Sequence, residues 1–284
     1  MSPEEILDRR WMRAAFERAA PGYDRVADLQ REVADRTLER LDFVRLDPPR
    51  VLDLGAGTGY GMRALGARYP RAEVHGLDIA QGMLREARRQ ALPGILERSL
   101  YVCGDALRLP LGNDAFPLVF SSLTLQWCED LPSALAEIWR VCAPGGLVLF
   151  SSLGPDTLGE LRDAWAGADG GSHVNRFLDM HLVGDALMAT GFRDVVTDVD
   201  RMTWFYPGVV GLMQSLKSLG AHNVRRDRPR HLTPPSRLES VQRRYEALRR
   251  PEGLPATYEV VYAHAWKPAV PVPGVAPAFG GAPP

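Results

Sequence analysis

The stretch RVLDLGAGTGY, residues Arg50 to Tyr60, decides the fold of this chain. An apolar run from Val51 to Leu54 leads into three glycines at alternate positions, Gly55, Gly57 and Gly59. The residues that follow carry apolar side chains at helical spacing. Strand, glycine turn and helix in this order let a ligand approach the backbone, because no side chain lies in the way.

Carboxylates follow three predicted strands. Asp53 lies two residues before the first glycine, and Asp78 lies at the tip of a second strand, nineteen residues after Gly59. Asp105 follows a third strand in VCGDALRLPL. Ligands of open α/β sheets bind outside these strand ends, where Asp78 can accept hydrogen bonds from a ribose diol. Asp105 and Ala106 would then lie beside an adenine ring.

The alternation of strand and helix continues to residue 152. FPLVFSSLTLQW (116–127) predicts a fourth strand, and residues 131–152 predict a helix, a Pro-Gly-Gly turn and a fifth strand. Residues 195–204 and 257–268 read as a sixth and a seventh strand. We therefore expect an α/β fold with a mostly parallel seven-stranded sheet and helices on both faces.

Residues 50–152 resemble the Rossmann-like class I S-adenosylmethionine-dependent methyltransferases. A nicotinamide dehydrogenase is the alternative, but its pyrophosphate turn is typically G-x-G-x-x-G, whereas this turn is G-x-G-x-G after an acid. Such a turn suits a ligand whose nearest part is an amino acid with an ammonium group. The resemblance assigns the following residues to S-adenosyl-L-methionine: Tyr23, Asp53, Gly55, Ala56, Gly57, Gly59, Asp78, Ile79, Met83, Asp105, Ala106, Leu107, Ser121 and Ser122.

The composition is that of an ordinary globular protein. The 284 residues are 45% hydrophobic and 24% charged, with a formal net charge of −1, so general binding to polyanions is not indicated. Cys103, Cys128 and Cys142 form no Cys-x-x-Cys pattern, and we expect small buried side chains rather than a metal site or a disulfide. No segment reaches the roughly 20 apolar residues of a membrane span, and the N-terminus lacks a signal peptide pattern. We expect a cytoplasmic protein without a membrane partner.

The regions flanking the core have separate expected roles within a single domain, residues 1–268. Residues 1–46 predict a helical lid, with one helix over 4–20 and a second helix that starts at Asp24 as its N-cap. Tyr23, at the junction, either points into the site or is a packed aromatic residue. Residues 50–152 form the cofactor-binding core, and 153–192 and 203–250 are inserts for substrate or partner. The Pro/Gly/Ala-rich residues 269–284 predict a disordered tail.

The second insert, which lies between the sixth and seventh strands, predicts two helices and has a strong charge asymmetry. Ten basic residues between 217 and 250 face three acids, which gives 10 − 3 = +7. The basic residues are Lys217, Arg225, Arg226, Arg228, Arg230, Arg237, Arg243, Arg244, Arg249 and Arg250, and the acids are Asp227, Glu239 and Glu246. A solvated helix surface is one interpretation, and an acidic partner surface is favoured. Nucleic acid is an alternative that we do not expect, because exposed aromatic residues are not interleaved with the charges.

Segments outside the shared core resemble the malonyl-[acyl-carrier protein] O-methyltransferases of biotin synthesis. They are FERAAPGYDRVADLQREVADRTLERL, SLGPDTLGELRDAW, HVNRFLDMH, LKSLGAHN and LPATYEVVYAHAW, and the resemblance spans about residues 11–268. The resemblance implies methylation of the free carboxylate of malonyl-acyl-carrier protein, or of malonyl-CoA, early in pimeloyl and biotin synthesis. RRDRPRHLTPPS departs from the family by being more basic and richer in proline. The alternatives are another small-molecule carboxyl or quinone-precursor methyltransferase, and a non-catalytic module that binds S-adenosylmethionine.

The implied acceptor needs no catalytic base, because a carboxylate is already ionised at pH 7. It does need a cation for recognition, and a guanidinium pairs with a carboxylate through two hydrogen bonds. Arg176 in HVNRF is the candidate, with His173 or Asn175 beside it, although a surface arginine is the simpler alternative. Tyr23 and Gln126 are further candidates for contacts to the reacting end. No metal site is expected.

Overall fold

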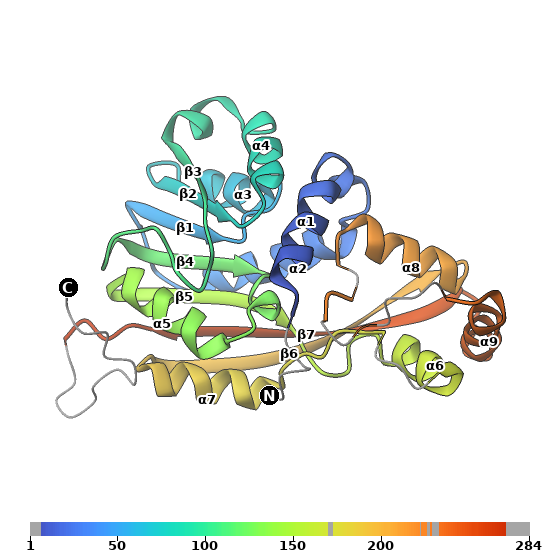
Figure 1. Ribbon diagram of the computed structural model, residues 1–284. Helices are drawn as coiled ribbons and strands as arrows, with labels where there is room; N and C mark the ends of the chain where they lie inside the picture. The colour runs from blue at the N-terminus through green and yellow to red at the C-terminus, as the bar shows by residue number, and fades with distance from the viewer. Residues whose placement is uncertain (1–6, 170–172, 222, 226–227, 229–232, 271–284) are drawn as a thin grey trace.

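A seven-stranded sheet runs through the whole molecule (Figure 1). The computed structural model describes residues 7–169, 173–221, 223–225, 228 and 233–270. Its strands are β1 (Arg50–Leu54), β2 (Glu73–Asp78), β3 (Ser99–Cys103), β4 (Phe116–Ser122), β5 (Cys142–Leu153), β6 (Arg193–Tyr206) and β7 (Leu254–Trp266). The order is β3-β2-β1-β4-β5-β7-β6, with β1 to β5 parallel and β7 antiparallel to both of its neighbours. The expected mostly parallel sheet is confirmed.

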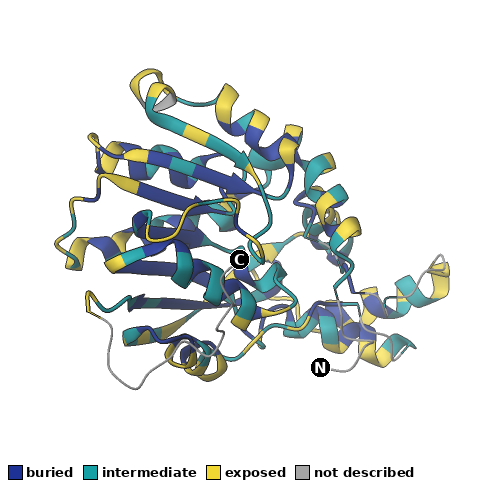
Figure 2. Cartoon of the chain, turned by 60° about the vertical axis from the view of Figure 1, so that its left-hand side comes forward, coloured by how far each residue is buried: buried dark blue, intermediate teal, exposed yellow. Residues whose placement is uncertain are grey.

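Helices cover both faces of the sheet, also as expected. The helices of this part are α2 (Asp28–Glu39), α3 (Tyr60–Arg68), α4 (Gln81–Arg89), α5 (Leu131–Val141) and α7 (Met180–Thr190). Leu52 and Leu54 of β1 pack with α5 and α7, whereas Val51 packs with α2, α3 and α4 on the opposite face. Figure 2 shows the buried residues concentrated along the strands. Each fully buried leucine contributes on the order of 2 kcal/mol, so this double core anchors the strand ends that form the site.

The strand order reverses beside β1. This strand pairs with β2 on one side (Asp53 opposite Gly76) and with β4 on the other (Asp53 opposite Phe120). The loops after β1 and β4 therefore diverge, and a crevice opens at their carboxyl ends. Short 3₁₀ helices lie at several connections, namely η2 (Ala20–Arg25), η3 (Arg40–Phe43), η4 (Pro93–Arg98) and η5 (Leu125–Trp127).

The N-terminal segment is helical but differs from the prediction at its junction. Helix α1 spans Arg9–Ala19, and the Asp8 carboxylate caps it by accepting a hydrogen bond from the Trp11 N–H at 3.0 Å. Asp24 does not cap α2, because its oxygens accept hydrogen bonds from Thr58 Oγ1 and Gln90 Nε2, each at 2.6 Å. These two tertiary bonds tie the junction to the glycine turn and to the end of α4.

The long strands β6 and β7 carry a second core at the far end of the sheet. Helices α6 (Gly159–Asp169), α8 (Val209–Ser218) and α9 (Pro235–Glu246) pack there, and α8 and α9 are the two helices predicted in the insert (Figure 1). Tyr245, Tyr258 and Tyr262 are buried in this cluster together with Leu29 and Val33 of α2. The N-terminal helices therefore pack against both the sheet and the insert.

The expectation that the three cysteines are small buried side chains holds for only part of the set. Cys142 is buried and Cys128 partly buried, but Cys103 is exposed, because it ends the edge strand β3. The predicted disordered tail, 269–284, falls almost wholly outside the described residues, and so does half of RRDRPRHLTPPS, including Arg226, Asp227 and Arg230. No described helix combines the length and the apolar character that crossing a bilayer requires.

Candidate active site

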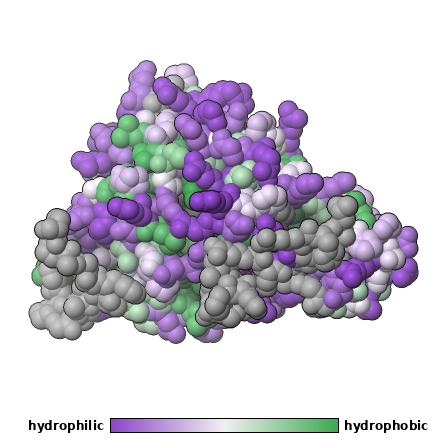
Figure 3. All heavy atoms as spheres, in the orientation of Figure 1, coloured by the Kyte–Doolittle hydropathy of each residue, from purple (hydrophilic) through white to green (hydrophobic). Residues whose placement is uncertain are grey.

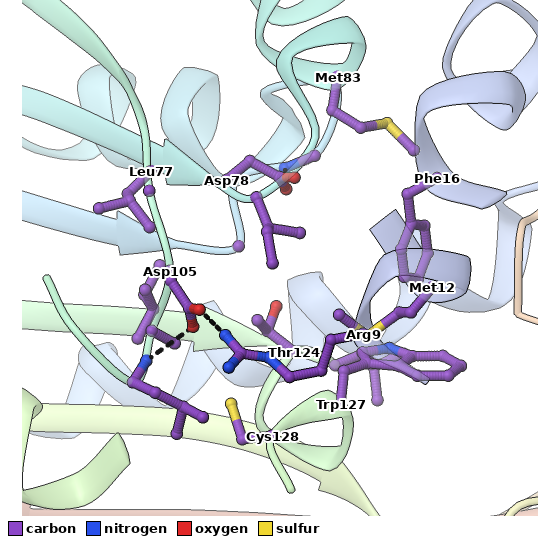
Figure 4. A pocket seen from close by; sticks show the side chains of 18 of the residues that line it. Arg9, Met12, Phe16, Leu77, Asp78, Met83, Asp105, Thr124, Trp127 and Cys128 are labelled. Carbon is purple, nitrogen blue, oxygen red and sulfur yellow. Dashed lines mark hydrogen bonds and ion pairs between the residues drawn. The ribbon is translucent and has the colours of Figure 1, made fainter. Parts of the chain in front are cut away.

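A cavity of about 750 Å³ lies at the reversal point of the sheet (Figure 4). The loops after β1, β2, β3 and β4 form its walls, and α1 covers it. Ten of the residues predicted for the cofactor line it: Tyr23, Gly55, Gly57, Asp78, Ile79, Met83, Asp105, Ala106, Leu107 and Ser122. We call this space the cofactor cavity. A neighbouring recess shares Tyr23 and Gly57 with it and adds Asp53 and Ala56.

The glycine turn has the backbone that its sequence requires. Gly55, Gly57 and Gly59 have φ values of 77°, 52° and 83°, in the left-handed region that favours glycine. A Cβ atom on Gly55 would lie 1.9 Å from Oγ1 of Thr124, whereas a Cβ on Gly57 would meet no atom within 4 Å. Gly55 therefore allows the turn to pack against the loop after β4, and Gly57 leaves open space for a ligand.

Asp53 and Asp78 are buried carboxylates on neighbouring strand ends. Burial raises the pKa of Asp53 to about 7, the nearby Asp78 adds to this, and the Met62 N–H opposes it. Within the described part of the chain, Oδ2 of Asp53 is buried without a hydrogen-bond partner. A buried acceptor left in this state is costly, and perturbed carboxylates of this kind are typical of ligand sites.

Asp78 is held in place by two backbone donors. The Ala80 N–H donates to Oδ1 at 2.8 Å, and the Gly57 N–H donates to Oδ2 at 3.0 Å. Burial nevertheless raises the pKa of Asp78 to about 6. Each carboxylate oxygen has a second lone pair, so the side chain can still accept hydrogen bonds from a diol.

Another wall of the cofactor cavity comes from the N-terminal segment. Tyr23 lines both the cofactor cavity and its recess, and burial, followed by Asp78 and Asp24, raises the pKa of its hydroxyl. The structure therefore favours the inward-pointing alternative for Tyr23. Three residues of α1, namely Arg9, Met12 and Phe16, also line the cavity, and Arg9 forms an ion pair with Asp105 (Figure 4). The sequence pattern did not indicate these three residues as lining the site, although their spacing places them on one face of a helix.

Two predicted cofactor residues do not line either space. Ser121 is buried, and its hydroxyl donates to the Leu54 carbonyl oxygen at 2.7 Å. Its neighbour Ser122 faces the cavity instead, because successive residues of a strand point to opposite faces. A Cβ on Gly59 would lie 2.9 Å from the Cβ of Ala87, so Gly59 serves the packing of the turn against α4.

A second cavity, with about 990 Å³ of empty space, adjoins the cofactor cavity, and Cys128 lines both. We call it the acceptor cavity. Its polar and charged lining consists of Gln126, Cys128, Glu129, Ser152, Arg176 and Arg225, and apolar side chains such as Phe150 complete it. Gln126 lies in η5, because β4 ends at Ser122 and does not extend over the predicted range 116–127. Its Nε2 donates to the Leu123 carbonyl oxygen at 2.8 Å.

His173 is not part of the acceptor cavity, contrary to the prediction. Its ring stacks on Trp165 at a centroid distance of 3.7 Å, and its Nε2 lies 3.0 Å from Oδ1 of Asp169. It lines a separate apolar cavity between α6 and α8. Asn175, the other proposed helper of Arg176, is buried, and its Oδ1 accepts a hydrogen bond from the Val224 N–H at 3.3 Å.

The basic residues of the insert that the structure describes do not form one surface. Arg225 is only 4% exposed, so its place in the predicted basic face is wrong. Arg237 pairs with Asp169, Arg249 pairs with Glu246, and Arg228 pairs with Asp8. Lys217, Arg243, Arg244 and Arg250 are exposed. Figure 3 shows hydrophilic side chains over the end of the molecule that carries α9, in agreement with an exposed charged surface there.

Known proteins resemble this chain at two levels. The family described as "Methyltransferase domain" matches residues 52–150. The YcgJ protein of Bacillus subtilis, a solved structure, shares the fold, with a TM-score of 0.58 and 18% identity over 82% of this chain and 99% of its own.

Two curated relatives match almost the whole chain, including both inserts. The malonyl-[acyl-carrier protein] O-methyltransferase of Gallionella capsiferriformans is 49% identical over 94% of this chain and 93% of its own length. The enzyme of the same name from Halorhodospira halophila is 53% identical over 92% and 89%. These matches decide against the dehydrogenase alternative. The chain belongs to the malonyl-[acyl-carrier protein] O-methyltransferase family, within the S-adenosylmethionine-dependent methyltransferases.

Proposed function

We propose that this protein, in the cytoplasm, methylates the free carboxylate of malonyl-acyl-carrier protein with S-adenosylmethionine, an early step of biotin synthesis. The observation that carries the proposal is the 49% identity over 271 residues, which extends far beyond the methyltransferase domain at 52–150. It includes the inserts that supply Arg176 and Arg225 to the acceptor cavity. Substrate choice resides in such additions to a shared fold.

The residues around the cofactor cavity fit S-adenosylmethionine. When bound, the cofactor supplies an electrophilic methyl group on a sulfonium. Asp78 would accept hydrogen bonds from the ribose hydroxyls, and Met83, Asp105 and Ala106 would surround the adenine. Asp53 lines the recess, and its Oδ2 has no hydrogen-bond partner among the described residues, so it would face the ammonium group of the methionine part. The open space at Gly57 lets the ligand approach the backbone.

The chain's own contribution to the reaction is positioning and exclusion of water. The malonyl carboxylate is the nucleophile and is ionised at pH 7, so no side chain has to remove a proton. Arg176 lines the acceptor cavity and is exposed, so it can meet a carboxylate that arrives from solvent. By holding one oxygen it would leave the other free to attack the methyl carbon. Alignment and a dry site then lower the barrier, because the opposite charges of nucleophile and donor cancel in the transition state.

The remaining assignments concern the lid and the partner. Residues 7–46 would act as the lid, since Tyr23 and α1 cover the cofactor cavity. Gln126, which lines the acceptor cavity, would contact the reacting end of the acyl substrate. Exposed Lys217, Arg243 and Arg244 would meet the acidic surface of the carrier protein, and such complementarity raises the rate of encounter more than the affinity. Malonyl-CoA is the smaller alternative acceptor.

Arg176→Met tests the proposal against a matched control, Arg71→Met, which removes an exposed arginine that pairs with Asp47 far from both cavities. Binding of S-adenosylhomocysteine should be unchanged in both variants. Turnover of malonyl-acyl-carrier protein by Arg176→Met should fall by about tenfold or more, because a charge-assisted pair is lost. Malonyl-CoA, small dicarboxylic acids and a quinone precursor are assayed in parallel. Preference for one of these, or binding without turnover of any of them, would refute the proposal.

A further inference from the structure

The acceptor cavity contains a second arginine, in a place that the sequence pattern did not indicate. Arg225 belongs to the basic insert, yet only 4% of it is exposed, and it lines the same cavity as Arg176. We propose that Arg225 is a specificity-determining residue, which forms with Arg176 a two-arginine site for the carboxylate of the acyl substrate. This inference rests on the proposed function and deepens it.

A hydrogen bond between their chain neighbours brings the two arginines together from distant parts of the chain. The Val224 N–H donates to Oδ1 of Asn175, so the residues that precede Arg225 and Arg176 are tied to each other. Asn175 and Val224 are both buried, which protects this bond from water. This bond links the two chain segments that carry Arg176 and Arg225, and both arginines line the same cavity.

The N-terminal segment completes this arrangement. Leu7 and Arg225 form an antiparallel bridge, and the Asp8 N–H donates to the Val224 carbonyl oxygen at 2.8 Å. Leu7 itself lines the acceptor cavity. The same segment continues into α1, whose Arg9, Met12 and Phe16 line the cofactor cavity. The carboxylate site and the cofactor cavity thus share one structural element.

The charges of the cavity fit an anionic acyl group. Counted over the described lining residues, the charged side chains are Arg176, Arg225 and Glu129, with formal charges of +1, +1 and −1 at pH 7, which leaves +1. A malonyl carboxylate has the opposite sign to this balance, whereas an acetyl group carries no charge. A buried guanidinium interacts with a carboxylate more strongly than an exposed one, because the local dielectric constant is lower. Arg225 is therefore the member of the pair that would discriminate most between charged and neutral acyl groups.

Steady-state kinetics of Arg225→Met and Arg225→Lys test the proposal, with Arg71→Met as the control. The methionine keeps the apolar stem, and the lysine keeps the charge but not the planar fork. We expect Arg225→Met to raise KM for malonyl-acyl-carrier protein about ten- to hundredfold with a smaller change in kcat. Arg225→Lys should recover part of this loss. Affinity for S-adenosylhomocysteine, measured by calorimetry, should match the wild type in both variants.

Two outcomes would overturn the proposal, and both leave the proposed function standing if the wild type methylates malonyl-acyl-carrier protein. One is an unchanged KM in both variants. The other is an equal loss in malonyl turnover and in S-adenosylhomocysteine affinity, which a merely structural role would produce. If Arg225→Met does not fold, Arg225→Lys decides alone: a raised KM with unchanged cofactor affinity supports the site, and a wild-type KM overturns it.

Discussion

Replacing Asp53 by asparagine is expected to remove a loss of stability that the ligand-free protein shows towards alkaline pH, while weakening its cofactor binding. Burial raises the pKa of Asp53 from 3.8 to about 7. Between these values the folded chain holds a proton that the unfolded chain has released, so this group makes wild-type stability fall as the pH rises from about 4 to about 7. The asparagine variant has no charge to bury and lacks this dependence.

The magnitude follows from the pKa shift. Each pH unit in this window changes the free energy of unfolding by about 1.4 kcal/mol. From pH 5 to pH 8, the stability difference should therefore move by about 3 kcal/mol in favour of Asp53→Asn. Any constant penalty for the buried amide, on the order of 1–3 kcal/mol, cancels in this comparison. In thermal unfolding the change corresponds to about 6 °C or more in the Tm difference.

Urea unfolding of the wild type and of Asp53→Asn gives the difference in their free energies of unfolding. The change in this difference between pH 5 and pH 8 is the quantity predicted. S-adenosylhomocysteine titrations at pH 8 measure the cost to binding, which should be about tenfold or more because the amide cannot pair with an ammonium group. Asp47→Asn, on the exposed surface, controls for the removal of one negative charge and should bind the ligand as the wild type does. The reasoning would be refuted if the stability difference between wild type and Asp53→Asn stayed constant with pH. Asp53 would then not be a buried carboxylate with a raised pKa.

Two further substitutions test the cofactor cavity. Asp78→Ala should weaken S-adenosylhomocysteine binding by about a hundredfold, because it removes the ribose acceptor and the anchor of the Gly57 N–H, and calorimetry that shows wild-type affinity would contradict this. Gly55→Ala should lower stability by more than 1 kcal/mol and abolish binding, since its φ is 77° and its Cβ would overlap Thr124. The control Gly22→Ala, where a Cβ meets nothing within 4 Å, should melt close to the wild type.

The local parts of the fold were predictable because short-range chemistry determines them. Strands β1 and β4 are buried on both faces and therefore read as apolar runs. The left-handed Gly191, with φ of 110°, ends α7 at Thr190, as a glycine after the last turn of a helix commonly does. The turn glycines reveal the cofactor cavity for the same reason, since positive φ angles favour glycine whatever the tertiary surroundings are.

Assignments that depend on tertiary contacts were less predictable. Asp24 has the residue type of an N-cap, yet its carboxylate is used by Thr58 and Gln90 from other elements. Arg225 looks like part of a solvated basic run, yet it is buried. Its neighbour Val224 is hydrogen-bonded to Asn175, a contact between distant segments that the sequence does not reveal. His173 stacks on Trp165, eight residues earlier, which sequence spacing across a loop does not reveal. Ser121 does not line the cofactor cavity, and this was foreseeable because side chains alternate between the two faces of β4.

Methyl transfer to malonyl-acyl-carrier protein is the measurement that tests the central claim most directly. The purified protein is incubated with S-adenosylmethionine and the malonylated carrier protein, and the products are followed by mass spectrometry. We predict one S-adenosylhomocysteine for each malonyl methyl ester formed, and no reaction with the acetylated carrier protein. Tight cofactor binding without ester formation, or equal reaction with the acetylated protein, would contradict the account.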